Sequence, residues 1–448
     1  MIKIIKSADL TSQQLEKLLT KPAFDQVELS AGIKKGILAM FGEELTAKQV
    51  VEKILQAVRA EGDQAVYHYT KLIDQVDFSK SGMQVTDAEI ATAYQRVKPN
   101  VLAAIKTAIA NVEKFHQEQL PKSWLTYREH GSILGQNTTA LDSVGIYVPG
   151  GTATYPSSVI MNAVPAKVAG VKEIIMVVPP AKDGSVDDYV LVTAAEIGVS
   201  KIFKVGGAQA VAALAFGTET VPKVDKITGP GNIFVTLAKK EVYGYCDIDM
   251  LAGPSEILII ADEQANPKYI ASDMLGQAEH DSLASSILIT TSLKTALATC
   301  AELEKQLPLL SRANIARTAL EANGLIIVVE DLLQAADLAN ISAPEHLEVL
   351  TQAPFELLPY LKHAGAIFLG EYSPEPLGDY FAGPNHVLPT GGTAKFYSVL
   401  NTETFMKKTS IIAYSQTALQ AVHQDIIAMA EAEGLTAHAN AIKVRFNS

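Results

Sequence analysis

The chain has few of the features that mark secreted or membrane proteins. Its 448 residues contain two cysteines, Cys246 and Cys300, which form no CxxC pair. Isolated thiols of this kind are typical of a reducing compartment and not of a disulfide framework. No apolar run approaches the length of a membrane span, and the N-terminal residues turn polar too early for a signal peptide. We therefore expect a cytoplasmic protein with no membrane partner.

Clusters of positive charge are also missing. The net charge is -12, and the basic residues are scattered singly or in pairs such as Lys239 and Lys240. Because binding to nucleic-acid phosphates needs clustered Lys and Arg, nucleic acid is not an expected partner. The content of 48% hydrophobic and 19% charged residues is that of a soluble globular protein. The length predicts two to four domains.

The first 125 residues are predicted to be helical. A short helix is expected from Ser12 to near Pro22, capping boxes pair Thr46 with Gln49 and Thr86 with Glu89, and a long helix is expected from Asn100 to about Gln119. The following segment alternates with period two, which predicts strands leading into a sheet.

From about residue 144 onward, short apolar strands alternate with helical patterns. The predicted strands fall into two sets, at 145–148, 173–178, 201–205 and 225–228, and at 256–261, 286–290, 325–330 and 366–370. Apolar strands with helical crossovers indicate parallel sheets covered on both faces. The sequence therefore predicts an α/β protein with two similarly built Rossmann-like domains. After Tyr372 a long loop is expected, and then a helical C-terminal tail.

Three glycine-containing turns each follow a predicted strand and precede a helix, at residues 148–158, 205–217 and 228–240. Backbone N–H groups at such helix N-termini can face an anion such as a dinucleotide pyrophosphate. None is a GxGxxG motif, and each turn taken singly is more often a plain connection between strand and helix. Three such turns in one domain leave a nucleotide site and plain connections equally favoured.

The stretch Asp249–Asp281 ends in the sequence QAEHD. Gln277 and His280 are three residues apart, so on a helix both side chains leave the same face and can converge on one ion. The alternative is a surface Gln beside a His at a helix C-terminus, where His is favoured. Further ligands must come from elsewhere, and Asp379 and His438 are the candidates. Such a mixed set suits Zn²⁺ kept available for Lewis-acid chemistry.

Glu345 and His346 follow Pro344 in a predicted turn. A carboxylate and an imidazole held together can divide proton transfers between them. The alternative is that Glu345 opens a helix. The remaining histidines are interpreted as structural or solvated, namely His68, His116, His130, His363 and His423.

Eight segments from about residue 144 to 443 together resemble the histidinol dehydrogenase family. They are VGIYVPGGTATYPSS, VGGAQAVAALAFGT, KITGPGNIFV, IDMLAGPSEILIIAD, GQAEHD, SAPEHLE, LGDYFAGPNHVLPT and EGLTAHANA. The resemblance implies a zinc-dependent oxidation of L-histidinol to L-histidine through L-histidinaldehyde, with two NAD⁺ consumed in the final steps of histidine biosynthesis.

The resemblance also implies roles for individual residues. The implied metal ligands are Gln277, His280, Asp379 and His438, and the implied catalytic pair is Glu345 and His346. The implied NAD contacts are Tyr147, Gln209 and Asn232. Ser255, His386 and Glu433 are implied to contact the substrate, together with the metal ligands and His346. A homodimer is implied in which His438, Glu433 and His386 complete the neighbouring subunit's site.

Pattern and resemblance together predict four regions. Residues 1–40 form a helical N-terminal segment, and residues 41–145 with 256–400 form a first, discontinuous α/β domain. Residues 146–255 form a second α/β domain that binds NAD. Residues 401–448 form a small tail domain for dimerisation.

Three other functions are considered. A relative that oxidises a sulfonated diol would need a cation near the substrate, which the tail around Glu433 lacks. A metallohydrolase leaves the glycine turns unexplained, and the sequence has no HExxH helix. A binding protein without activity is disfavoured because no candidate catalytic position is missing.

Overall fold

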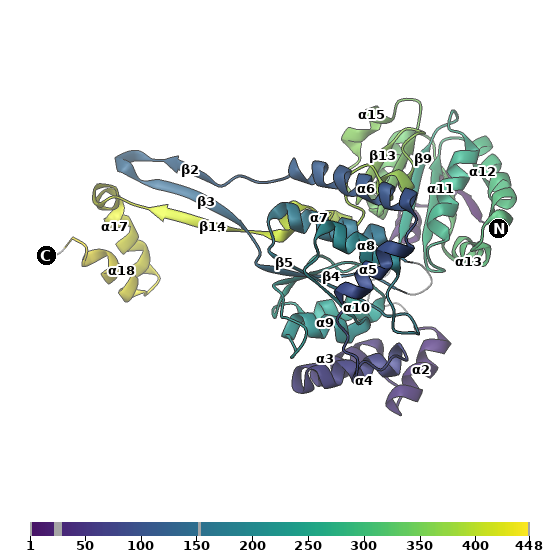
Figure 1. The fold of residues 1–448 in the computed structure, drawn as a ribbon. Helices are drawn as coiled ribbons and strands as arrows, with labels where there is room; N and C mark the ends of the chain where they lie inside the picture. The colour runs from purple at the N-terminus through teal and green to yellow at the C-terminus, as the bar shows by residue number, and fades with distance from the viewer. Residues whose placement is uncertain (1, 22–28, 151–153, 447–448) are drawn as a thin grey trace. The chain divides into compact units, whose positions relative to one another are not determined.

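Two parallel β-sheets, each covered by helices, make up most of the chain. The computed structural model describes residues 2–21, 29–150 and 154–446. The chain divides into a larger unit, Met1–Gln119 with Leu141–Phe405, and a smaller unit, Leu120–Ala140 with Met406–Ser448. Both parallel sheets belong to the larger unit (Figure 1).

The first parallel sheet has the strand order β1-β11-β10-β9-β12-β13 within the described residues. Its strands are β1 (Lys3–Lys6), β9 (Glu256–Ala261), β10 (Ser285–Thr290), β11 (Leu325–Val328), β12 (His346–Leu350) and β13 (Ala366–Leu369). Every residue of β9 is buried, and its side chains alternate between two apolar clusters. Such a strand needs helices on both faces of the sheet, which explains its continuous apolar sequence.

The helices of this half cover both faces of the sheet. They are α1 (Ser12–Leu19), α11 (Pro267–Ala278), α12 (Leu293–Gln306), α13 (Ala313–Asn323), α14 (Leu332–Ser342), α15 (Pro354–Leu357) and α16 (Glu375–Tyr380). Helix α11 packs its buried residues Ile270, Met274 and Leu275 into the cluster of Ile257 and Ile259. The short helix α16 follows β13 in the chain.

The second parallel sheet has the order β6-β5-β4-β7-β8. Its strands are β4 (Ser143–Tyr147), β5 (Glu173–Val178), β6 (Lys201–Lys204), β7 (Lys226–Thr228) and β8 (Asp247–Ile248), and its helices are α7 (Pro156–Ala169), α8 (Asp188–Ile197), α9 (Gly207–Phe216) and α10 (Ile233–Val242). Five N-terminal helices also belong to the larger unit, namely α2 (Ala31–Phe41), α3 (Ala47–Glu61), α4 (Asp63–Ile73), α5 (Asp87–Arg96) and α6 (Pro99–Gln117).

The two sheets are wound in the same way. Apart from β1, which joins the edge of the first sheet beside β11, three successive strands in each sheet are added in one direction, and the next two are added on the other side of the first of these. The winding therefore reverses between β4 and β7 in one sheet and between β9 and β12 in the other. Such switch points are where α/β sheets usually bind ligands. The prediction of two similarly built α/β halves is confirmed, while the predicted domain boundaries stay predictions.

The smaller unit holds an antiparallel sheet and two helices. The sheet has the order β14-β3-β2, with β2 (Trp124–Tyr127), β3 (Ile133–Ala140) and β14 (Met406–Ala413), and the helices are α17 (Gln416–Ala432) and α18 (Thr436–Lys443). The buried apolar cluster of the two helices is small and contains Ile427, Ala430 and Ala439.

Several predicted elements are corrected by the structure. Strand β1 lies in a segment predicted to be helical, and β14 lies in a tail for which no strand was predicted; both are strands because of partners far away in sequence, β11 and β3. Strands β2 and β3 do not lead into a parallel sheet but pair with each other and, through β3, with β14. The expected loop after Tyr372 contains α16.

Helix starts are predicted better where a side-chain cap exists. The capping boxes at Thr46 and Thr86 are confirmed. The long helix begins at Pro99 with Lys98 as N-cap, and not at Asn100 as predicted, because proline fits the first helical position. Among the described residues no helix has both the length and the apolar character needed to cross a bilayer. Pro22 and residues 151–153 of the first glycine turn lie outside the described residues.

The capping box at Thr86 gives a test of this local structure. Thr86→Ala removes the acceptor of the Glu89 N–H bond at the start of α5 and should lower the free energy of unfolding by about 1 kcal/mol. Thr107→Ala is the matched control, because Thr107 is an exposed residue inside α6 and alanine is the better helix former. Chemical denaturation of both variants measures the difference, and equal midpoints would contradict the assigned role of the cap.

Candidate active site

One residue, Glu256, orients both members of the predicted catalytic pair. Its backbone N–H donates to Glu345 Oε2 at 2.9 Å, and its carbonyl accepts from His346 Nδ1 at 3.0 Å. Glu256 begins β9 and His346 begins β12, and these two parallel strands are neighbours at a switch point. His346 is therefore the first residue of β12, and Glu345 lies in the bend directly before it, so the alternative of a helix start is wrong and the predicted turn ends at Glu345.

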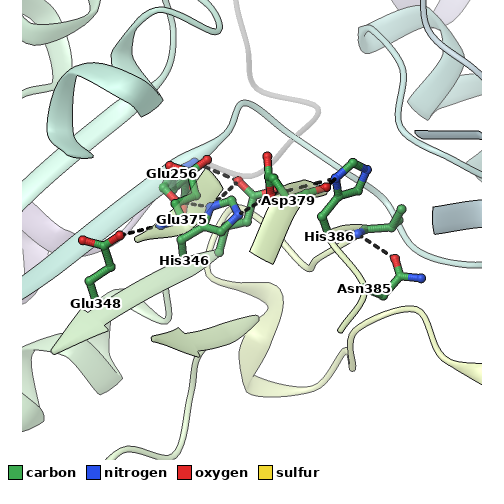
Figure 2. Close-up of polar contacts among 9 residues, drawn as sticks. Glu256, His346, Glu348, Glu375, Asp379, Asn385 and His386 are labelled. Carbon is green, nitrogen blue, oxygen red and sulfur yellow. Dashed lines mark hydrogen bonds and ion pairs between the residues drawn. The ribbon is translucent and has the colours of Figure 1, made fainter. Parts of the chain in front are cut away.

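The bond from His346 to the Glu256 carbonyl decides which ring nitrogen can act as a base. Since a carbonyl only accepts, Nδ1 carries the hydrogen in the neutral ring, and Nε2 keeps its lone pair. Nε2 is buried without a hydrogen-bond partner among the described residues and lies 3.7 Å from Asp379 Oδ1. Figure 2 shows the two side chains facing each other. The site thus presents one free proton acceptor beside a carboxylate.

Three side chains near His346 have the arrangement of a metal site. Ligand atoms of His280, Glu375 and Asp379 all lie within 4.8 Å of one another. Asp379 and Glu375 are four residues apart on α16, so one helix face presents both carboxylates. His280 lies in the turn after α11 and not on the helix as predicted, because its N–H bonds to the Gln277 carbonyl and tightens the last turn.

The buried amide of Gln277 also fits a metal or ligand. Gln277 is fully buried on α11, and neither polar atom of its side chain has a hydrogen-bond partner among the described residues. An unpaired buried amide is costly unless a ligand completes it. Nitrogen and oxygen donors without cysteine suit zinc in a catalytic role. The residues of this chain therefore fit the implied metal.

More buried carboxylates support the helix that carries Asp379. Glu348 on β12 accepts a hydrogen bond from the Glu375 N–H at 2.8 Å, and Asp273 on α11 shares a hydrogen bond with Glu348. Burial raises the pKa of Glu375 to about 7 and that of Glu348 to about 9. These groups hold together the three elements that carry Gln277, His346 and Asp379.

Burial also changes the pKa values of the predicted catalytic pair. Desolvation raises the pKa of Glu345 to about 8, although the neighbouring His346 opposes this shift. Burial alone would lower the pKa of His346, but the carboxylates of Glu345 and Glu375 outweigh it and raise that pKa. Both groups therefore hold protons more tightly than they would in water. His346 Nε2 is an acceptor only in the neutral ring, which a positive charge beside these carboxylates would favour. A carboxyl raised toward neutral pH is suited to proton transfer.

The predicted cofactor residues lie at the carboxyl edge of the second sheet. Tyr147 ends β4, and its hydroxyl accepts from the Gly207 N–H at 3.1 Å. Gln209 lies in the first turn of α9, fully buried, and neither polar atom of its side chain has a partner in the part of the chain that is described. Asn232 caps α10 by accepting from the N–H groups of Phe234 and Val235. This edge is the switch point between β4 and β7, as expected for a dinucleotide site.

His386, expected to complete the neighbouring subunit's site, lies beside Asp379 of its own chain. His386 Nδ1 donates to the Asp379 carbonyl at 3.1 Å, which leaves Nε2 as an acceptor in the neutral ring. Asn385 donates to the Met161 carbonyl at 2.6 Å and lies 3.4 Å from Nε2 of the buried His116. Ser255 directly precedes Glu256, whose backbone bonds to the predicted catalytic pair.

The last two predicted site residues lie in the smaller unit. Glu433 is the C-cap of α17 and His438 lies in the first turn of α18, and both are exposed in the single chain. All other predicted site residues lie in the larger unit. Within the larger unit, Asp379 lies near both His280 and His346.

A family model for histidinol dehydrogenase matches residues 42–446. The chain belongs to the histidinol dehydrogenase family. A curated histidinol dehydrogenase of Heliobacterium mobile is 56% identical over 88% of this chain and 92% of that protein, and one of Bacillus subtilis is 54% identical over 89% and 93%. A crystal structure of histidinol dehydrogenase from Elizabethkingia anophelis has a TM-score of 0.90 at 35% identity and covers 99% of this chain and 98% of that one.

Membership of the histidinol dehydrogenase family establishes an oxidoreductase of class EC 1.1.1.23 that acts in histidine biosynthesis. The family uses zinc and NAD, and the group of His280, Glu375 and Asp379 provides a possible metal site. The structure also adds site residues that were not predicted, namely Glu256, Glu348 and Glu375. Of these, only Glu375 left a signal in the sequence, since it lies four residues before Asp379.

The contact between His116 and Asn385 predicts a pH dependence of stability. Burial lowers the pKa of His116, although its bond to the Val112 carbonyl opposes the shift. The folded state prefers neutral His116, so the free energy of unfolding is undiminished above the unfolded pKa of about 6.5. It falls as the pH drops below that value, because His116 must then be protonated on unfolding. His116→Gln should therefore lose less stability than the natural chain between pH 7.5 and 5.5, with a difference of at most about 1.4 kcal/mol per pH unit. Denaturant titrations at both pH values measure the slopes, and parallel slopes would rule out this role.

Proposed function

We propose that Glu345 and His346 carry out the proton transfers that convert L-histidinol to L-histidine through L-histidinaldehyde, with two NAD⁺ as hydride acceptors. The observation that carries the proposal is the pair of hydrogen bonds that the Glu256 backbone makes with Glu345 and His346. The bond to His346 Nδ1 leaves Nε2 as an acceptor in the neutral ring. Gln277, His280, Asp379 and the His438 of a second subunit would hold zinc, and Glu375 lies among them. When bound, zinc supplies a Lewis acid and a positive charge beside the carboxylates that raise the pKa of His346.

The residues of the chain divide the work of the two oxidations. His346 Nε2 accepts the hydroxyl proton of histidinol as hydride leaves for NAD⁺. Glu345, with its pKa raised to about 8, removes a proton from the water that adds to the aldehyde. After His346 releases its first proton to solvent, its Nε2 accepts a proton from the aldehyde hydrate as the second hydride leaves for the second NAD⁺. His386 Nε2 is an acceptor for an imidazole N–H, which suits a histidinol side chain.

We infer that Tyr147, Gln209 and Asn232 contact NAD at the β4–β7 switch point. Three features support this assignment. The buried amide of Gln209 lacks a protein partner among the described residues, Asn232 stands at the N-terminus of α10, and the turn between β7 and α10 is made of Gly229, Pro230 and Gly231. Backbone N–H groups at such a helix start favour a pyrophosphate.

The active assembly is proposed to be a homodimer in the cytoplasm. The smaller unit leaves large apolar side chains exposed, with Tyr127 77% and Ile412 74% accessible, while its buried helix cluster is small. Exposed apolar surface of this kind marks an interface. A second copy is the proposed occupant, because His438 and Glu433 on this unit would supply the ligand and the carboxylate that the larger unit does not contribute. The free thiols of Cys246 and Cys300 fit a reducing compartment.

Glu345→Gln separates the roles within the pair. We expect this variant to slow the conversion of added histidinaldehyde to histidine by about 10²-fold or more, because no other general base is assigned to the hydration step. Reduced nicotinamide absorbance with zinc-loaded protein measures both half-reactions. Glu356→Gln is the matched control, since Glu356 is exposed on α15. If Glu345→Gln left both half-reactions within about threefold of the natural chain, its role as a general base would be wrong.

His438→Ala tests the shared site. The variant should lose bound zinc, measured by metal analysis after gel filtration, and should have almost no activity. Mixed with Glu345→Gln by co-expression, it should recover about a quarter of the natural activity, because half of the dimers then contain one intact site. Zinc should occupy about half of all sites, because each heterodimer keeps one zinc site and the Glu345→Gln homodimers keep both of theirs. Absence of recovery, with heterodimers verified by affinity tags on each chain, would argue against sharing between subunits.

A further inference from the structure

A buried ion pair lies beneath the turn that precedes α10. Lys239 on α10 and Asp249, which follows β8, are in contact, and their side chains are 3% and 1% exposed. Removing two charges from water is costly, and a buried pair is maintained only where further hydrogen bonds satisfy both groups. The proton transfers assigned above use neither residue. The contacts of the pair therefore indicate what it does.

Both members bond to the same glycine. Lys239 Nζ donates to the Gly229 carbonyl at 2.9 Å, and Asp249 Oδ2 accepts from the Gly229 N–H at 2.8 Å. The second oxygen of Asp249 also accepts from the N–H of Met250 at 2.6 Å. Both polar backbone groups of Gly229 are thus fixed by one ion pair. Charge-assisted bonds of this kind are stronger than bonds between neutral groups.

Gly229 lies at a position where its placement affects the cofactor edge. Its φ is +109°, and a Cβ at this residue would lie 2.2 Å from the Tyr147 carbonyl oxygen. No other residue type fits such an approach. Three residues later, Asn232 caps α10. A small shift of Gly229 would therefore move the turn relative to both Tyr147 and Asn232.

Asp249 also begins the segment that crosses from one sheet to the other. Residues 249–255 connect β8 to β9, and Ala252 in this segment accepts from Thr236 Oγ1 on α10 at 3.0 Å. The segment ends at Ser255, directly before Glu256, which orients the catalytic pair. The ion pair thus fixes the cofactor turn to the chain segment that leads to the substrate side.

We propose that Lys239 and Asp249 are positioning residues that hold the turn Gly229–Asn232 against Tyr147 in the conformation that binds NAD. The inference rests on the proposed function of this edge as the NAD site. It adds to that function two residues that contact neither metal nor substrate in their assigned roles. A pair that only stabilised the fold would leave the NAD affinity of the folded protein unchanged.

The test compares Lys239→Met, Asp249→Asn and the double variant as zinc-loaded protein. Loss of a charge-assisted bond to Gly229 should raise the dissociation constant of NAD by about 10- to 100-fold in each single variant. Because the two residues act as one unit, the double variant should bind NAD no more weakly than the single variant with the lower NAD affinity. Equilibrium dialysis with NAD measures affinity, and steady-state kinetics should show a raised KM for NAD with an unchanged KM for histidinol and an unchanged zinc content.

Two further variants make the outcome decisive. Lys53→Met removes an exposed ion pair with Glu43 in the same unit and should leave NAD affinity within about twofold of the natural value. Asn232→Ala tests the proposed cofactor site itself. If Asn232→Ala weakens NAD binding and Lys239→Met does not, the positioning role is wrong while the proposed site stands. If neither variant changes NAD affinity, the proposed cofactor site is wrong as well.

Should Lys239→Met not fold, Lys239→Gln takes its place with the same thresholds, since its uncharged side chain is one atom shorter and cannot form the ion pair with Asp249. A folded Lys239→Gln with natural NAD affinity overturns the proposal. A folded variant with lowered NAD affinity and natural zinc content supports it.

Discussion

The chemistry of this protein depends on the pairing of two parallel strands, β9 and β12. Their register places the N–H and the carbonyl of Glu256 beside Glu345 and His346, so a backbone segment and not a flexible side chain orients both groups. Because β9 is buried on both faces, the peptide groups at its first residue cannot move without disturbing the sheet. The assignment of the base to His346 Nε2 follows directly from this pairing.

The two sheets share one winding order but use opposite edges. The proposed cofactor residues Tyr147 and Asn232 lie at carboxyl ends of the second sheet, where ligands of α/β folds usually bind. The proposed catalytic pair lies at the amino ends of β9 and β12, although this too is a switch point. The segment 249–255 joins the two edges, starting at Asp249 beside Gly229 and ending next to Glu256. A hydride donor and acceptor must meet, and this segment is the shortest chain connection between the two sites.

Local patterns predicted the parts of this fold that depend on local sequence. Strands β5 and β9 were predicted at their observed limits, because continuous apolar runs bounded by turns need no distant information. Strands β1 and β14 were missed since their pairing partners lie far away in the chain. For the site, the resemblance named the acid–base pair, but the sequence showed neither the role of the Glu256 backbone nor the buried group of Glu348 and Asp273. A contact made by a backbone group does not depend on the residue type at that position, so the sequence does not reveal it.

The concentration of buried carboxylates argues that the larger unit is built around a cation. Glu345, Glu348 and Glu375 are all buried with raised pKa values, and Asp379 lies among them. A cluster of like charges away from water is unfavourable, so each group must be protonated, hydrogen-bonded or matched by positive charge. Hydrogen bonds from the Glu256 and Glu375 N–H groups satisfy Glu345 and Glu348 in part. The imidazoles of His346, His386 and His280 face Asp379 and oppose its burial cost. A cation beside His280 would match Glu375 and Asp379 further, so the charge that would make the site reactive would also favour its burial.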